Sequence, residues 1–249
     1  MAGHSHWAGI KHKKALIDNK RGKVWSKLSK AIIVAAKMGG GDPGMNPRLR
    51  QAILDARAVS MPKDNIERAV KKGTGELDGG NVEEVLYEGY GPGGVAVMCE
   101  ALTDNRNRTA PEMRSLFDKY GGKLGATNCV AYLFDRKGLF VFEPPLDEEP
   151  ITLVAMEHGA DDVQLQEGGK LEVTCPVDAF MALQDAFEAA SLTAKVKEVT
   201  RIAQNTVDLD PETAKNVLKL LEALDDHDDV QTVSTNLNLS AETLAAMGE

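Results

Sequence analysis

The chain has little of several features that define common protein classes. It contains three cysteines in 249 residues, Cys99, Cys129 and Cys175, with no C-x-x-C pair and an odd number that cannot all pair internally. A disulfide scaffold is therefore not expected, and a reducing compartment is favoured. The longest purely apolar run, residues 31–36, is far shorter than the roughly 20 residues of a membrane span. We expect a soluble cytoplasmic protein without a membrane segment.

Local motifs for catalysis and cofactor binding are also missing. The chain has no G-x-S-x-G, no P-loop and no cysteine beside an activating motif. Residues 89–94 fit G-x-G-x-x-G, but a strand follows them, whereas the dinucleotide fingerprint must open a helix. We predict a glycine turn at this position, no cofactor, and a protein that is not an enzyme.

Two segments contain residue types that bind metals. His4, His6 and His12 lie near lysines, with no carboxylate or thiol within the stretch. The run Asp225–Asp229, called the acidic turn below, lacks the twelve-residue alternation and central glycine of an EF-hand. We predict no bound metal. The acidic turn is interpreted as a solvated connection between a helix and a strand, with protein docking or a weak cation site as alternatives.

The charge of the chain is divided unevenly along its length. Residues 1–80, the basic head, carry 16 Lys and Arg against 7 Asp and Glu, a net charge of +9. Residues 81–249, the acidic body, carry 13 against 31, a net charge of −18. This division favours a polyanion-binding segment on a scaffold that repels polyanions elsewhere.

The head is predicted to be helical, with a loop at residues 38–44 and an end at residues 73–80. Lysines between residues 20 and 37 fall on one side at about 100° per residue, and apolar residues such as Leu28 and Ile32 occupy the neighbouring face. Asn46-Pro47 predicts the start of a second helix and Pro62 that of a third. One face of the first helix is therefore expected to pack and the other to be cationic.

The body alternates between strand and helix patterns. We expect strands at 82–90 and 95–102, and a capping box at residues 109–112 that starts a helix. The order β-α-β-β-α-β in residues 136–202 is typical of a ferredoxin-like fold. A last helix and strand lack partners of their own, and we expect them to return to the first sheet. The predicted class is α+β with three domains: residues 1–80, residues 81–135 with 203–249, and the inserted residues 136–202.

The polar run Asp104–Thr109 carries Arg106 and Arg108 just before a predicted helix. Guanidinium groups beside free backbone N–H groups suit a phosphate. The same arginines could instead pair with carboxylates of the acidic body. The residues leave both interpretations open.

Several motifs in order resemble one known family. They are residues 3–14 (GHSHWAGIKHKK), 39–43 (GGGDP), 46–50 (NPRLR), 61–69 (MPKDNIERA), 87–94 (YEGYGPGG), 102–109 (LTDNRNRT) and 228–232 (DDVQT). The chain resembles the YebC/PmpR family, described as transcriptional regulators, which also includes a mitochondrial translational activator of a cytochrome oxidase subunit. The resemblance implies a helical bundle and two α+β domains, the third domain inserted into the second. The chain departs from the family at Ser60, where asparagine is usual, and at Asn128-Cys129, where Gly-Ser is usual.

Together these observations predict a nucleic-acid-binding regulatory protein. The resemblance implies DNA and transcription, whereas the composition indicates only a polyanion; the alternative is a translation factor or translational activator that binds RNA or the ribosome. Protein partners could dock on the acidic body. The residues predicted to contact nucleic acid are Lys11, Lys13, Lys14, Lys20, Arg21, Lys23, Lys27, Lys30, Arg48, Arg50, Arg106 and Arg108.

Overall fold

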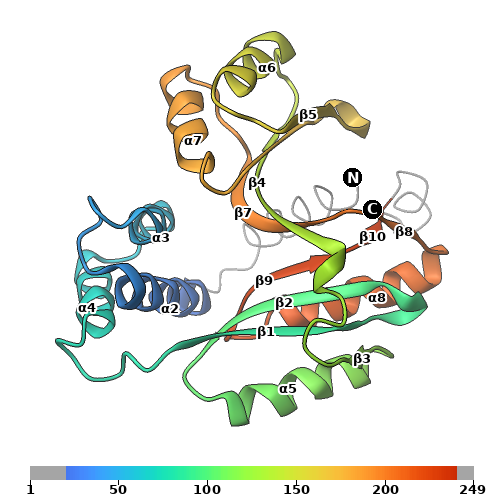
Figure 1. The fold of residues 1–249 in the computed structure, drawn as a ribbon. Coiled ribbons are helices and arrows are strands. Elements are labelled where there is room, and N and C mark those ends of the chain that lie inside the picture. Colours follow the sequence, from blue (N-terminus) through green and yellow to red (C-terminus); the bar gives the residue numbers. More distant parts are fainter. Residues whose placement is uncertain (1–20, 240–249) are drawn as a thin grey trace.

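The computed structural model describes residues 21–239, apart from the side chains of Arg21 and Glu167. A helical head lies beside a central sheet, and a second sheet with two helices lies above it (Figure 1). The predicted α+β class is confirmed. Among the described helices, none is both long and apolar enough to cross a membrane.

Three helices make up the described part of the head. Asn46 fixes the angle between the first two, because its side-chain oxygen accepts from Leu49 N at 3.1 Å and its Nδ2 donates to the Ala35 carbonyl oxygen at 2.8 Å. The core of the head also takes in Val82 and Leu102, so apolar contacts join the head to the body. The helices are α2 (Arg21–Gly39), α3 (Pro47–Ala58) and α4 (Lys63–Gly73).

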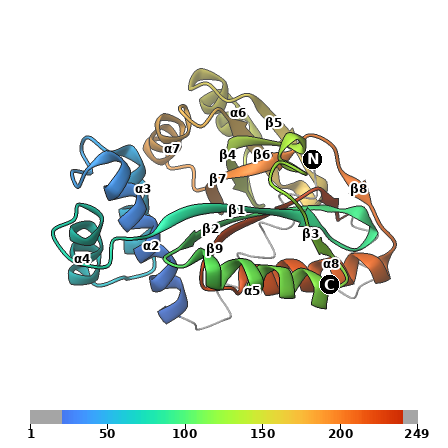
Figure 2. The same ribbon diagram turned by 60° about the horizontal axis from the view of Figure 1, so that its bottom comes forward.

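The central sheet has the strand order β3-β1-β2-β9. Helices α5 and α8 cover one face of it, and the second sheet lies on the other side (Figure 2). The predicted glycine turn joins β1 and β2, with Gly93 and Gly94 at φ 71° and 78°. The elements are β1 (Glu83–Tyr90), η1 (Pro92–Gly94), β2 (Ala96–Thr103), α5 (Arg106–Lys119), β3 (Lys123–Leu124), η2 (Ala131–Leu133), α8 (Pro211–Asp225) and β9 (Val230–Thr235), with a short parallel pair of β8 (Val207–Asp208) and β10 (Leu237–Asn238).

The second sheet has the antiparallel order β5-β6-β4-β7, which is the ferredoxin-like arrangement for the chain order β-α-β-β-α-β. Alternate residues of β4 pack on opposite faces, with Phe140 and Phe142 against the helices. The elements are β4 (Phe134–Phe142), α6 (Glu148–Glu157), β5 (Asp162–Leu165), η3 (Glu167–Gly169), β6 (Leu171–Cys175), α7 (Phe180–Ala189) and β7 (Val196–Ala203).

The two sheets are joined where β4 begins and β7 ends. Phe134 and Ala203, at these two ends, pack with Ala96 and Met98 of β2. After β7 the chain reaches α8 and then β9, which pairs antiparallel with β2. The bounds expected at residues 135/136 and 202/203 thus fall inside strands, and the division into domains stays a prediction.

Left-handed backbone conformations occur at two positions where the chain departs from the family pattern. Ser60 has φ 56° and Asn128 has φ 65°. Asn128 is also held by Glu88, a buried carboxylate that accepts from the backbone nitrogens of Asn128, Val130 and Ala131 at 2.7, 3.0 and 2.9 Å. Asparagine tolerates this backbone region better than most residues with a side chain, so the departure at Asn128 keeps the turn accessible.

Candidate nucleic-acid interface

Three lysines of α2 face the acidic turn that follows α8. Lys23 Nζ donates to the carbonyl oxygen of Asp226 at 3.2 Å and pairs with the Asp228 carboxylate at 3.4 Å. Lys27 Nζ donates to the carbonyl oxygen of Asp225. Carbonyl groups in the last turn of a helix lack intrahelical donors and carry the negative end of the helix dipole, so lysines suit this position.

The helical spacing of the lysines predicted a free cationic face on α2. In the structure this face contacts the acidic turn. Lys23, Lys27 and Lys30 contact carbonyl and carboxylate oxygens of residues that lie about 200 positions away in the sequence. The helical spacing alone could not predict these contacts. The interaction of these lysines with nucleic acid stays a prediction. A polyanion that reached them would have to compete with the acidic turn.

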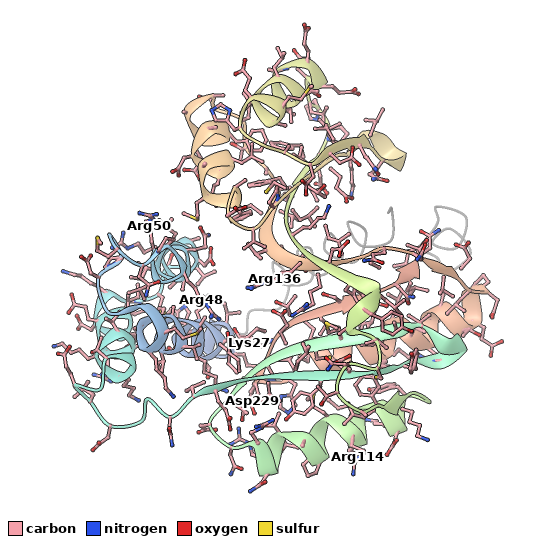
Figure 3. The ribbon with its side chains drawn as sticks, in the orientation of Figure 1. Lys27, Arg48, Arg50, Arg114, Arg136 and Asp229 are labelled. Carbon is pink, nitrogen blue, oxygen red and sulfur yellow. The ribbon has the colours of Figure 1, made fainter. Side chains whose placement is uncertain are left out.

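Asp229 is the centre of a buried ion-pair network at this junction. Its side chain is 1% exposed and pairs with Lys30 of α2 and, at 2.8 Å, with Arg108 of α5. Thr109 and Thr103 donate to the same carboxylate at 2.7 and 3.2 Å. Burial alone would raise the pKa of Asp229, but the hydrogen bonds from Lys30, Thr109 and Arg108 outweigh it and hold the pKa far below its usual value. One carboxylate therefore fastens the head, β2 and α5 together (Figure 3).

The start of α5 differs from the prediction. The helix was expected to open at residues 109–112, but Asn105 is the N-cap, with its side chain accepting from Arg108 N at 3.1 Å. Asparagine is among the strongest N-cap residues and takes precedence over the later capping box. Arg106 lies 3.7 Å from the Glu83 carboxylate. The pairing of both arginines with carboxylates, one of the two interpretations left open, is present in the structure; contact with phosphate stays a prediction.

The second helix of the head presents arginines on its exposed side. Arg48 pairs with Glu84 of β1. Arg50 is exposed and has no ion pair with any carboxylate among residues 21–239. Arg57, seven residues further along α3, is also exposed and makes no such pair in the same range. The sequence prediction missed Arg57, although helical spacing from Arg50 was a signal that could have found it.

Other exposed cations lie outside the predicted set. Arg68 and Lys71 of α4, Arg114 of α5 and Arg136 of β4 are exposed, without an ion pair to the described part of the chain. Figure 3 places Arg50, Arg114 and Arg136 on three different elements. The predicted residues Lys11, Lys13, Lys14 and Lys20, and the three N-terminal histidines, lie outside the described residues, as does the side chain of Arg21.

One group among the described residues has ligand types that could hold a metal ion, namely Glu112, His227 and Asp229, with ligand atoms within 4.8 Å of one another. The Asp229 backbone nitrogen donates to His227 Nδ1 at 3.1 Å, which leaves the proton on Nε2 to donate to Glu112 at 3.0 Å. Both imidazole nitrogens are therefore engaged, and Lys30 and Arg108 beside Asp229 oppose a further cation. The group behaves as a hydrogen-bonded network.

The cysteine thiols are not activated for chemistry. Burial raises the pKa of Cys99 strongly and that of Cys175 to about 11. Burial also raises the pKa of Cys129. Because the thiolate is the nucleophile, the raised pKa values favour the protonated, less nucleophilic thiol at neutral pH.

Comparison with known proteins gives matches along almost the whole chain. The model of the N-terminal domain of TACO1/YebC proteins matches residues 5–76, and that of their second and third domains matches residues 82–237. A protein of Rhodopirellula baltica named "Probable transcriptional regulatory protein" is 66% identical over 98% of this chain and 100% of its own length. A protein of Geobacter sulfurreducens with the same description is 52% identical over 98% of both chains. The crystal structure of a conserved hypothetical protein from Aquifex aeolicus has a TM-score of 0.85 and 48% identity, covering 94% of this chain and 97% of its own.

Proposed function

Because the chain belongs to the TACO1/YebC family, we propose that it is a nucleic-acid-binding regulatory protein that acts on DNA as a transcriptional regulator. The names of its relatives, which describe regulators of transcription, support the regulatory part. The proposal places the protein in the cytoplasm, in keeping with cysteines that form no disulfide.

The observation that carries the proposal is the set of exposed arginines on α3. The chain has 38 Asp and Glu against 29 Lys and Arg, so carboxylates are available in excess. Arg50 and Arg57 nevertheless make no ion pair within residues 21–239, whereas Lys23 and Lys30 of α2 pair with carboxylates. Guanidinium groups left to solvent on one helix face suit the bidentate binding of phosphates.

The experiment is a salt series of binding affinity with the full chain, duplex DNA and a structured RNA. Replacing Arg50 and Arg57 with Gln should lower the slope of log affinity against log salt by about 1.8 on duplex DNA, and weaken all sequences about equally. The matched control is Lys215→Gln with Lys219→Gln, two exposed cations of α8 that remove the same charge from the body. Equal losses in both double variants would contradict the assignment to α3.

A second candidate function is the regulation of translation through structured RNA. It is favoured by the presence of exposed arginines on both α3 and β4, because a ligand that touches both elements must follow a folded surface (Figure 3). A straight duplex that is read by one helix in its major groove would not contact arginines on separate elements of this kind. Preference for structured RNA over duplex DNA in the same salt series would replace the first proposal with this one.

A further inference from the structure

A groove of about 460 Å³ lies where the head, the central sheet and the second sheet meet. Its wall contains four side chains that donate hydrogen bonds and two carboxylates. Those that matter here are Arg48 of α3, Arg136 of β4, Arg201 of β7 and Gln231 of β9, together with the carboxylates Glu84 and Glu100. Figure 3 shows Arg48 and Arg136 on opposite sides of this region.

Arg136 and Arg201 lie directly opposite each other in the antiparallel pair of β4 and β7. Like charges at opposed positions of a sheet repel each other and destabilise the pair. Glu100 neutralises one of the two arginines, since its carboxylate accepts from Arg201 Nε at 2.8 Å. Arg136 is exposed and has no ion pair within residues 21–239. Arg136, Arg201 and Glu100 together therefore carry a net charge of +1.

Gln231 adds an unsatisfied donor to the same wall. Val230 pairs with Ala101 and Thr232 with Glu100, which leaves Gln231 as the extra residue of a β-bulge. Bulges re-aim side chains and are common beside functional sites. The Nε2 of Gln231 is shielded from solvent and has no hydrogen-bond partner in the described part of the chain. An acceptor bound in the groove would satisfy it.

The opposite wall comes from the head. Arg48 reaches the groove from α3, the helix that also presents Arg50 and Arg57, and pairs there with Glu84. A nucleic-acid strand held along the exposed side of α3 can therefore continue into the groove. The three arginines and two glutamates of the wall leave a net charge of +1, which favours an anion over a cation or a neutral ligand.

We propose that this groove is a phosphate-binding site that receives one phosphodiester group of the bound nucleic acid. Arg136 and Gln231 donate to the phosphate oxygens, and Arg201 and Arg48, held in place by their glutamates, add positive charge. This assignment rests on the proposed function and extends the nucleic-acid surface from the head to the second sheet.

The first test compares Arg136→Gln with Arg114→Gln in the full chain. Both arginines are exposed and have no ion pair to a described carboxylate, so the two variants lose the same charge, but Arg114 lies on α5 outside the groove. Arg136→Gln should weaken nucleic-acid binding about tenfold at constant salt and lower the salt slope by about 0.9 on duplex DNA. Arg136→Lys should recover only part of the affinity, because lysine cannot bind a phosphate with a planar fork.

The second test removes a negative charge from the groove instead of a positive one. Glu100→Gln frees Arg201 from its carboxylate and should raise the affinity, whereas Glu157→Gln, an equal charge change at the end of α6, should not. Gln231→Met removes the unsatisfied donor at nearly the same side-chain length and should lower the affinity. Thermal melting of every variant confirms that the chain is folded.

The outcomes separate the two proposals. If the wild-type chain binds neither duplex DNA nor structured RNA, the proposed function fails. If it binds them and Arg136→Gln behaves like Arg114→Gln or like wild type, the groove proposal alone is overturned. A third arm measures inorganic phosphate and a nucleoside diphosphate. Loss of their binding in Arg136→Gln with unchanged nucleic-acid affinity would make a free phosphate compound the occupant and overturn the assignment to a phosphodiester.

Discussion

Replacing Asp229 with asparagine tests the idea that one buried carboxylate fastens the head to the body. The amide side chain would keep the shape of the carboxylate and could still accept from Thr109, but it would carry no charge. Lys30, whose side chain is 17% exposed, would then lie in a mostly buried position without its counter-ion. Arg108 is 44% exposed and can turn to solvent, so most of the cost falls on Lys30.

The size of the expected loss of stability follows from the burial of the ion pair between Asp229 and Lys30. Removing one partner of a buried ion pair typically costs about 3–5 kcal/mol of the free energy of unfolding, because the other charge remains desolvated. We expect about 3 kcal/mol for Asp229→Asn, since Lys30 keeps the carbonyl oxygen of Asp228 as an acceptor at 3.2 Å. Asp228→Asn, at a side chain 64% exposed and paired with Lys23, should cost below about 1 kcal/mol.

The pH dependence has a definite sign. The pKa of Asp229 is lowered in the folded state, so the unfolded chain binds its proton first as the pH falls. The stabilisation is therefore complete above the unfolded pKa of about 3.9 and is lost as the pH falls from there towards the folded pKa. The difference in free energy of unfolding between wild type and Asp229→Asn should be constant from about pH 5 to 7 and shrink below about pH 4.

Urea titrations at a series of pH values measure this difference, with Asp228→Asn as the control for an exposed charge of the same turn. Groups that titrate identically in both proteins cancel in the subtraction. A cost below about 1 kcal/mol at pH 7, or a difference that does not change between pH 5 and 3, would refute the view that Asp229 holds the junction as a buried anion.

Three further predictions concern the fold. Asn128→Val should cost about 1–2 kcal/mol in urea unfolding because a β-branched side chain opposes φ 65°, while Asn128→Gly should remain close to wild type; equal stabilities would contradict this. Glu88→Gln should cost about 2 kcal/mol because three backbone N–H groups donate to the carboxylate, and a variant as stable as wild type would show that the charge is unnecessary. Residues 134–203 alone should melt cooperatively in circular dichroism, since their strands and helices enclose a core of their own; a gradual melt would count against this.

Local patterns were enough to predict much of the fold. Asn46-Pro47 predicted the start of α3, and the helix begins at Pro47 with Asn46 as its N-cap. The order of strands and helices in residues 136–202 predicted the ferredoxin-like arrangement, because short connections and right-handed crossovers leave few alternatives. The start of α5 was placed too late, since two capping signals, Asn105 and Thr109, lie within a few residues and the asparagine is the stronger N-cap.

The candidate interface was harder to predict. Helical periodicity placed Lys23, Lys27 and Lys30 on one face of α2, but it contains nothing about what that face contacts. Their partners in the acidic turn are about 200 residues away, and electrostatic pairing across such a separation depends on how the sheets bring α2 and α8 together.

The sequence by itself determined the class of the fold, the basic head and the excess of carboxylates in the body, because composition and periodicity are local properties of the chain. Only the tertiary structure decided which cations are neutralised and which remain open. Arg136 and Arg201 become neighbours through the register of β4 and β7, and Gln231 joins them through a bulge in β9. The sequence gives the charge of each residue. Whether that charge is neutralised depends on its distance from an opposite charge, and this distance is set by the packing of elements that are remote in sequence.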